Sequence, residues 1–202
     1  MTEAAGSPAG IRPRVVVTGH DADGRAVVVE DSRATPAANP GLTDYFAVLW
    51  GIDELPHFPD SGARQPLTSI SPGVGAVRFV QIIVPPSGDQ PLTVAPGQQR
   101  RESMRTVPGA APGVHFTASV DFLVVIEGEV WLELPDGVEV HLRPGDSVVQ
   151  NGTAHAWRNH GTHTARVGVV AIGTPHDGAA ARSAVAPVRS GKSNSSFRTD
   201  RS

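Results

Sequence analysis

The stretch that decides the fold runs from residue 120 to residue 173 and reads VDFLVVIEGEVWLELPDGVEVHLRPGDSVVQNGTAHAWRNHGTHTARVGVVAIG. Turn sequences such as PDG at 135–137 and PGD at 144–146 divide it into short apolar runs. Within 130–134 and 138–143 aliphatic residues occupy every second position, which is typical of strands with one buried and one solvent-facing side. Many short strands without an interleaved helical period predict an all-β sandwich or jelly-roll barrel.

Composition narrows the class of protein further. The 202 residues suffice for one domain of ordinary size with a substantial core. A formal charge of -3 without a basic stripe argues against nucleic acid as a partner. The chain has no cysteine, which excludes disulfides, thiolate catalysis and cysteine-ligated zinc. We find no signal-like or membrane-spanning apolar segment, and therefore expect a cytoplasmic protein without a membrane partner.

The ends of the chain differ from its middle. Residues 1–10 and 177–202 have few large apolar side chains, so we predict that both ends are disordered. An N-terminal extension spans 11–74 and the barrel 75–176. In the extension, RVVVTGHDADGRAVVVED at 14–31 predicts a β-hairpin. An isolated hairpin is marginal in water, so it should pack on its own barrel or on a second subunit in a homodimer.

Residues 75–173 resemble the cupin superfamily in its small single-domain form. The second cupin motif matches Gly145, Gly152, His155 and Asn159, one residue shorter than its usual spacing. Together with HFTASVDFLVVIEGE at 115–129, this motif is similar to a subgroup of cupins often found near biosynthetic genes. The resemblance implies a double-stranded β-helix, the jelly-roll barrel of cupins.

The first cupin motif supplies the remaining candidate site residues. It matches His115 and Asp121, with Thr117 where a second histidine is usual. With His155 the resemblance implies two imidazoles and one carboxylate around one divalent metal ion, Fe, Zn, Mn or Ni. Because Thr117 removes one ligand, a metal-free site is the alternative, with His155 as an acid/base group tuned by Asp121.

The chain must satisfy a geometric condition if His115 and Asp121 are to act at one site. Six residues of extended strand span about 20 Å, so His115 and Asp121 can share a cavity only if the chain bends at 117–119. No glycine or proline in that segment favours the bend, and the sequence leaves this point open.

We infer which residues contact the substrate from the side of the strand on which they lie. Trp157 shares the face of His155 because the two positions alternate with Ala156. We also assign Gln150, Phe116 and Thr117 to substrate contact. The alternatives are a core role for Trp157 and Phe116, a surface position for Gln150, and a structural role for His155.

These observations predict an enzyme whose partner is a small-molecule substrate. The resemblance to biosynthetic cupins implies a lyase (dehydratase or decarboxylase) or an isomerase acting on a carbonyl-bearing, polyketide-like metabolite, with His115, Asp121 and His155 as catalytic groups. One alternative is an iron(II)-dependent dioxygenase. Another is a cupin that binds a small ligand without catalysis.

Overall fold

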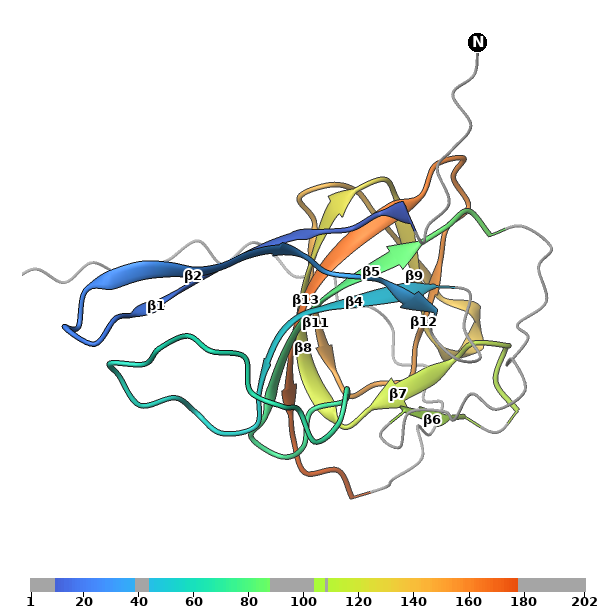
Figure 1. Ribbon diagram of the computed structural model, residues 1–202. Helices are drawn as coiled ribbons and strands as arrows, with labels where there is room; N and C mark the ends of the chain where they lie inside the picture. Colours follow the sequence, from blue (N-terminus) through green and yellow to red (C-terminus); the bar gives the residue numbers. More distant parts are fainter. Residues whose placement is uncertain (1–9, 39–43, 88–103, 108, 178–202) are drawn as a thin grey trace, which may run out of the picture.

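The computed structural model describes residues 10–38, 44–87, 104–107 and 109–177 (Figure 1). The ends predicted to be disordered lie almost wholly outside these ranges. The elements, in chain order, are β1 (Arg14–His20), β2 (Ala26–Arg33), β3 (Ala37–Ala38), β4 (Tyr45–Ile52), β5 (Val77–Val84), β6 (Met104–Thr106), β7 (His115–Thr117), β8 (Ser119–Glu127), β9 (Val130–Glu133), the short 3-10 helix η2 (Pro135–Gly137), β10 (Glu139–Leu142), β11 (Ser147–Asn151), β12 (Ala156–Arg158) and β13 (Ala165–Gly173).

Two sheets enclose the core. The larger has the strand order β11-β8-β13-β5-β4-β3, and the smaller has the order β10-β9-β12. The main cluster of buried side chains draws on both sheets: Val84, Leu123, Val125, Val130, Leu132, Leu142, Trp157, Ala165, Val167 and Val169. Each strand therefore buries one of its two sides between the sheets. The predicted all-β jelly-roll class is confirmed.

The N-terminal segment forms the predicted hairpin, in which β1 and β2 pair antiparallel. Val15 of β1 packs on Ala47 and Leu49 of β4. The His20 amide donates to the Asp60 carbonyl at 2.8 Å. The hairpin therefore packs on the larger sheet through β1, while its far end runs away from the barrel (Figure 1).

The larger sheet begins earlier in the chain than we predicted. Strands β3 and β4 belong to it, although they precede the boundary placed at residue 75. The reason is the register of β4 with β5, which runs from the Tyr45–Ile83 pair to the Ile52–Val77 pair. Within the described ranges, no helix is long and apolar enough to span a membrane.

Candidate functional site

The chain bends where the candidate site requires it. Strand β7 ends at Thr117, Ala118 forms a bend, and β8 begins at Ser119. The change of direction turns the segment between His115 and Asp121 around a corner, so that both side chains face one cavity. The geometric condition that the sequence left open is therefore met.

A backbone bridge brings the two candidate histidines together. His115 donates its amide to the His155 carbonyl at 2.9 Å, and His155 donates its own to the His115 carbonyl at 2.8 Å. The ring centroids lie 4.7 Å apart. The juxtaposition of the rings thus follows from strand pairing and not from an interaction that only the side chains make.

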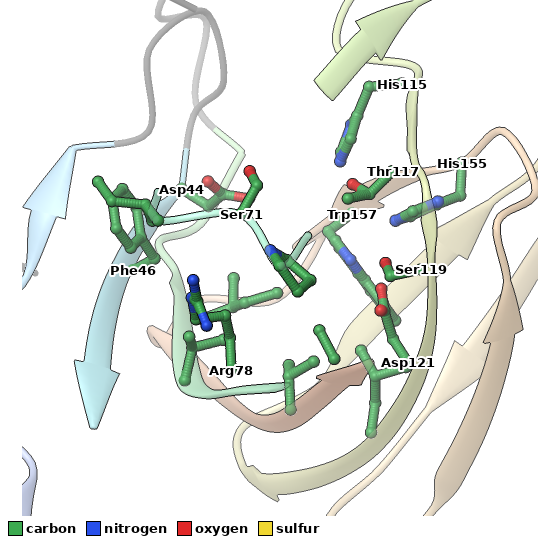
Figure 2. A pocket seen from close by; sticks show the side chains of 17 residues that line it. Asp44, Phe46, Ser71, Arg78, His115, Thr117, Ser119, Asp121, His155 and Trp157 are labelled. Atoms are coloured by element: carbon green, nitrogen blue, oxygen red, sulfur yellow. The ribbon is translucent and has the colours of Figure 1, made fainter. Parts of the chain in front are cut away.

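These rings open on a cavity with about 700 Å³ of empty space, counting the solvent at its mouth. Figure 2 shows His115, Thr117, His155, Ser119 and Asp121 along one wall. The full lining is Asp44, Phe46, Ile70, Ser71, Pro72, Arg78, Val80, Ile82, His115, Thr117, Ser119, Asp121, Leu123, His155, Trp157, Val169 and Ala171. The lining is polar along the wall of β7 and β8 and largely apolar elsewhere, as in many small-molecule sites.

Both imidazoles are held in the same tautomer. Nδ1 of His115 lies 2.9 Å from the Gly113 carbonyl, and Nδ1 of His155 lies 2.9 Å from the Thr153 carbonyl. A carbonyl oxygen can only accept, so each Nδ1 carries a proton and donates it. In the neutral ring Nε2 is then an acceptor, and for His155 it faces the cavity (Figure 2).

The environment keeps His155 uncharged. Burial lowers the pKa of His155 to about 3, and the neighbouring His115 adds to this effect, while the bond to the Thr153 carbonyl opposes it. Near neutral pH the ring is therefore an acceptor through Nε2 and not a cation.

One oxygen of the Asp121 carboxyl group lies in the cavity wall without a hydrogen-bond partner among the described residues. Neither Asp121 Oδ1 nor Ser119 Oγ makes a hydrogen bond of ordinary geometry with the described residues. Burial raises the pKa of Asp121, and the nearby Ser119 hydroxyl offsets this only in part. Buried polar atoms normally have partners, so two such atoms without one on a cavity wall indicate a place where a ligand binds.

Arg78, which the sequence reading missed, is a structural cation in the cavity wall. Its side chain is 1% exposed. It donates through Nε and one terminal nitrogen to the Ser69 carbonyl, and through the other terminal nitrogen to the Ile52 and Val77 carbonyls. It also forms an ion pair with Asp53. All five N–H groups are thus used within the protein.

This arginine fixes one side of the cavity. Its bonds to Ser69 hold the start of a segment whose next residues, Ile70, Ser71 and Pro72, line the cavity. Asp53 is tied to the same segment through the amide and hydroxyl of Thr68. We call Arg78 and Asp53, with their hydrogen bonds, the clamp. The clamp joins β4 and β5 to a segment without regular secondary structure, which gives the cavity a defined wall.

Two of the four residues predicted to contact substrate line the cavity, namely Thr117 and Trp157. Phe116 does not line it. Phe116 lies between two cavity-facing residues of β7, so strand alternation points it to the other side, where it stacks on His176 at 4.9 Å.

Gln150 is also absent from the lining. It is 4% exposed and lies opposite Asp121 in the strand register. Its side-chain amide, however, donates to the Thr153 carbonyl at 2.9 Å and stabilises the turn before His155. We therefore correct its assignment from substrate contact to support of the site.

The predicted three-ligand metal centre needs His115, Asp121 and His155 grouped around one point. The two imidazoles have the Nδ1 anchoring that is usual for metal-binding histidines. Within the described residues, however, no three His, Asp or Glu side chains are grouped closely enough to hold an ion. Asp121 shares the cavity without completing a ligand set, so the residues do not fit that centre.

Comparison with known proteins places this chain in a family. The Cupin domain model matches residues 103–172. Phomopsin biosynthesis cluster protein D of Diaporthe leptostromiformis is 31% identical over 153 residues, which cover 76% of this chain and 73% of the relative. This chain belongs to the cupin superfamily.

Two further relatives match less of their own length. Oryzines biosynthesis cluster protein J of Aspergillus oryzae is 52% identical over 52 residues, which are 26% of this chain and 29% of that protein. The cupin-domain-containing oxidoreductase srdB of Neurospora crassa is 28% identical over 143 residues, covering 71% of this chain and 64% of that protein.

Proposed function

We propose that this cupin is an enzyme that moves protons on a small, carbonyl-bearing metabolite and so catalyses a dehydration or an isomerisation. The observation that carries the proposal is the Asp121 carboxyl group, whose Oδ1 has no hydrogen-bond partner among the described residues, in one cavity with the neutral imidazole of His155. Burial raises the pKa of Asp121, so its carboxylate is a stronger proton acceptor than an ordinary aspartate.

The cavity residues supply complementary roles for such a reaction. Asp121 takes a proton from the carbon next to the substrate carbonyl, and the Ser119 hydroxyl donates a hydrogen bond to the oxygen that gains charge. His155 Nε2 accepts a hydrogen bond from a substrate hydroxyl. In a dehydration the proton returns from Asp121 to the departing hydroxyl group, giving water and a carbon–carbon double bond. In an isomerisation it returns to a different carbon.

The remainder of the lining favours an uncharged, partly apolar substrate. Leu123, Trp157 and Val169 present apolar surface that fits a carbon skeleton. Among the described lining residues Arg78 is the one lysine or arginine, and its N–H groups are all occupied. This favours dehydration or isomerisation over decarboxylation, whose substrate carries a carboxylate.

The relatives support a place in specialised metabolism. Two of them are named as proteins of biosynthesis clusters. Polyketide-like intermediates are rich in β-hydroxy ketones and 1,3-dicarbonyl groups, whose acidic C–H bonds suit the proposed chemistry. We therefore propose that the substrate is such an intermediate.

The test is turnover of a panel of small cyclic β-hydroxy ketones, without oxygen and with a metal chelator. We expect formation of the unsaturated ketone, and a loss of at least about 100-fold in rate for Asp121→Asn because acid/base groups contribute 10²–10⁴-fold. Glu127→Gln, an exposed carboxylate of the same strand, is the matched control and should keep the rate. Equal rates for Asp121→Asn and wild type would contradict the proposal.

An oxidoreductase, including an iron(II)-dependent dioxygenase, is the second candidate function, favoured by the name of srdB. Oxygen consumption that requires added iron(II) would establish it in place of the lyase. Binding of the same ketones without turnover in either test would instead indicate a ligand-binding cupin.

A further inference from the structure

Two polar side chains lie across the cavity from the wall of β7 and β8. Both Asp44 and Ser71 line the cavity, and Figure 2 shows them on the side opposite Ser119 and Asp121. We call Asp44 and Ser71 the distal pair. The distal pair precedes residues 103–172, which match the Cupin domain. The matched domain thus contains the groups to which we assign the reaction, and the chain before it supplies the surface that faces them.

The start of β4 directs the Asp44 side chain into the cavity. Asp44 directly precedes β4, and Phe46, two residues later, lines the same cavity. Tyr45, between them, pairs in register with Ile83 of β5. Because its neighbour is paired to the larger sheet, Asp44 has a defined position. The residue is 6% exposed, so its carboxyl group faces the cavity and not bulk water.

The clamp holds the second member of the distal pair. The Ser71 amide donates to Ser69 Oγ at 3.2 Å. The Ser69 carbonyl in turn accepts two hydrogen bonds from Arg78. Ser71 is also 6% exposed. Both polar groups of the distal pair are therefore positioned by the protein before a ligand arrives, which lowers the entropic cost of binding one.

The chemistry of the distal pair suits a ligand group that donates hydrogen bonds. An aspartate carboxylate has two oxygens that together accept several hydrogen bonds, so a contact within the protein leaves capacity for a ligand. The Ser71 hydroxyl can donate or accept. Among the described lining residues the one arginine or lysine is Arg78, whose N–H groups all bond to the protein. The described lining therefore favours a donor over a negatively charged group at this position.

We propose that the distal pair selects substrates that carry a hydroxyl or protonated amino group at the end distant from the reacting carbonyl. This inference rests on the proposed function, which places the reacting end against Ser119 and Asp121. A ligand that spans the cavity from that wall then presents its other end to Asp44. A hydroxyl or ammonium group there donates to the carboxylate, whereas a methyl group removes this hydrogen bond without replacing it. Sites built to hydrogen-bond a substrate group discriminate strongly against analogues that lack it.

Binding of matched ketones to an inactive variant tests this selection. The probes are three cyclic β-hydroxy ketones of similar size, which carry a hydroxyl, an amino or a methyl group on the ring carbon most distant from the carbonyl. In Asp121→Asn, calorimetry should show that the hydroxyl or the amino probe binds at least about tenfold more tightly than the methyl probe, as expected for a hydrogen bond to a charged group. The stronger of the two donor probes identifies the group as neutral or charged.

Variants of Asp44 assign the preference to this residue. The double variant of Asp121→Asn with Asp44→Ala should bind the three probes with similar affinity. Combining Asp121→Asn with Glu54→Ala, which removes an exposed carboxylate outside the cavity lining, is the matched control and should keep the preference. If Asp44→Ala folds poorly, Asp44→Asn keeps the shape of the side chain and should reduce the preference to about threefold, because hydrogen bonds to neutral groups are roughly half as strong.

Turnover by wild type separates the failure of this inference from the failure of the proposed function. If wild type converts the donor and methyl probes with equal kcat/KM, the proposed reaction stands and selection by the distal pair is overturned. If a binding preference depends on Asp44 and no probe is converted, the selection stands and the proposed reaction is overturned. Equal affinities for the three probes, no binding of either donor probe, or a preference unchanged by both Asp44 variants would overturn the inference.

Discussion

At the residue scale, the same local arrangement orients both histidines of the site. Each ring donates Nδ1–H to the carbonyl of the residue two positions earlier, and each backbone pairs with the other. The protein thereby fixes the ring orientation and the tautomer with backbone groups alone. This is consistent with our proposal that the Asp121 carboxyl group, and not a histidine, is the acid/base group of the site.

The depressed pKa of His155 predicts a dependence of stability on acid. Between about pH 3 and 6.5 the unfolded chain binds a proton that the folded chain does not, so the free energy of unfolding falls as the pH is lowered through this window. In His155→Gln this contribution is gone, and denaturant unfolding at a series of pH values should give a shallower decline. His57→Gln, on an exposed loop, should keep the wild-type slope. An equal slope in His155→Gln would contradict the buried neutral ring.

The motif positions predicted His115, Asp121 and His155 as neighbours because their side-chain types and spacing follow a pattern. Ser119 was missed, although it lies two residues before Asp121 and so faces the same side of β8. Phe116 was placed in the cavity against that same rule of alternation. Strict use of the two-residue alternation of a strand would have placed Ser119 in the cavity and Phe116 outside it.

At the element scale, Arg78 holds a segment without regular structure against two strands. We expect Arg78→Met to lower the free energy of unfolding by at least about 2 kcal/mol, because it removes the ion pair with Asp53 and leaves the Ser69, Ile52 and Val77 carbonyls without this donor. Arg166→Met, which removes the more exposed ion pair with Glu127, should cost at most about 1 kcal/mol. Denaturant titration measures both, and similar losses in the two variants would contradict the clamp.

Sequence could not predict this clamp. In the run AVRFVQ a single arginine among apolar residues is usually on a solvent-facing side of a strand. Its burial depends on carbonyls from residues 52 and 69, which only the tertiary fold brings together. Gln150 was misassigned for a related reason. Only the folded turn shows that its side-chain amide donates to the Thr153 carbonyl and is not directed at a ligand.

At the scale of the whole molecule, the hairpin is part of the packed structure. Removing residues 1–31 deletes Val15 and uncovers Ala47 and Leu49 of β4. We expect a loss of about 2 kcal/mol or more, because burying a valine or leucine contributes about 1.5–3 kcal/mol. Removing residues 1–9 alone leaves both hairpin strands and should leave the midpoint of thermal unfolding unchanged. A midpoint unaffected by the longer deletion would mean that the hairpin does not stabilise the barrel.

The all-β class and the jelly-roll architecture were predictable, since turns and alternation recur along most of the chain. The exposure of large apolar side chains on the outer side of the larger sheet was not predictable. A run such as FLVVI gives the same sequence pattern whether both sides of a strand are buried or one is left exposed. Only the arrangement of the sheets shows that Phe122 and Val124 lie outside the core.

The most direct test of the site is the titration of the Asp121 carboxyl group by ¹³C NMR, compared between wild type and Asp121→Asn to assign the signal. A carboxyl group buried on the cavity wall without a cationic partner should have a pKa above the ordinary aspartate value of about 3.9. A pKa at or below that value would place the carboxylate in water or beside a cation, and would contradict its role as the proton-moving group.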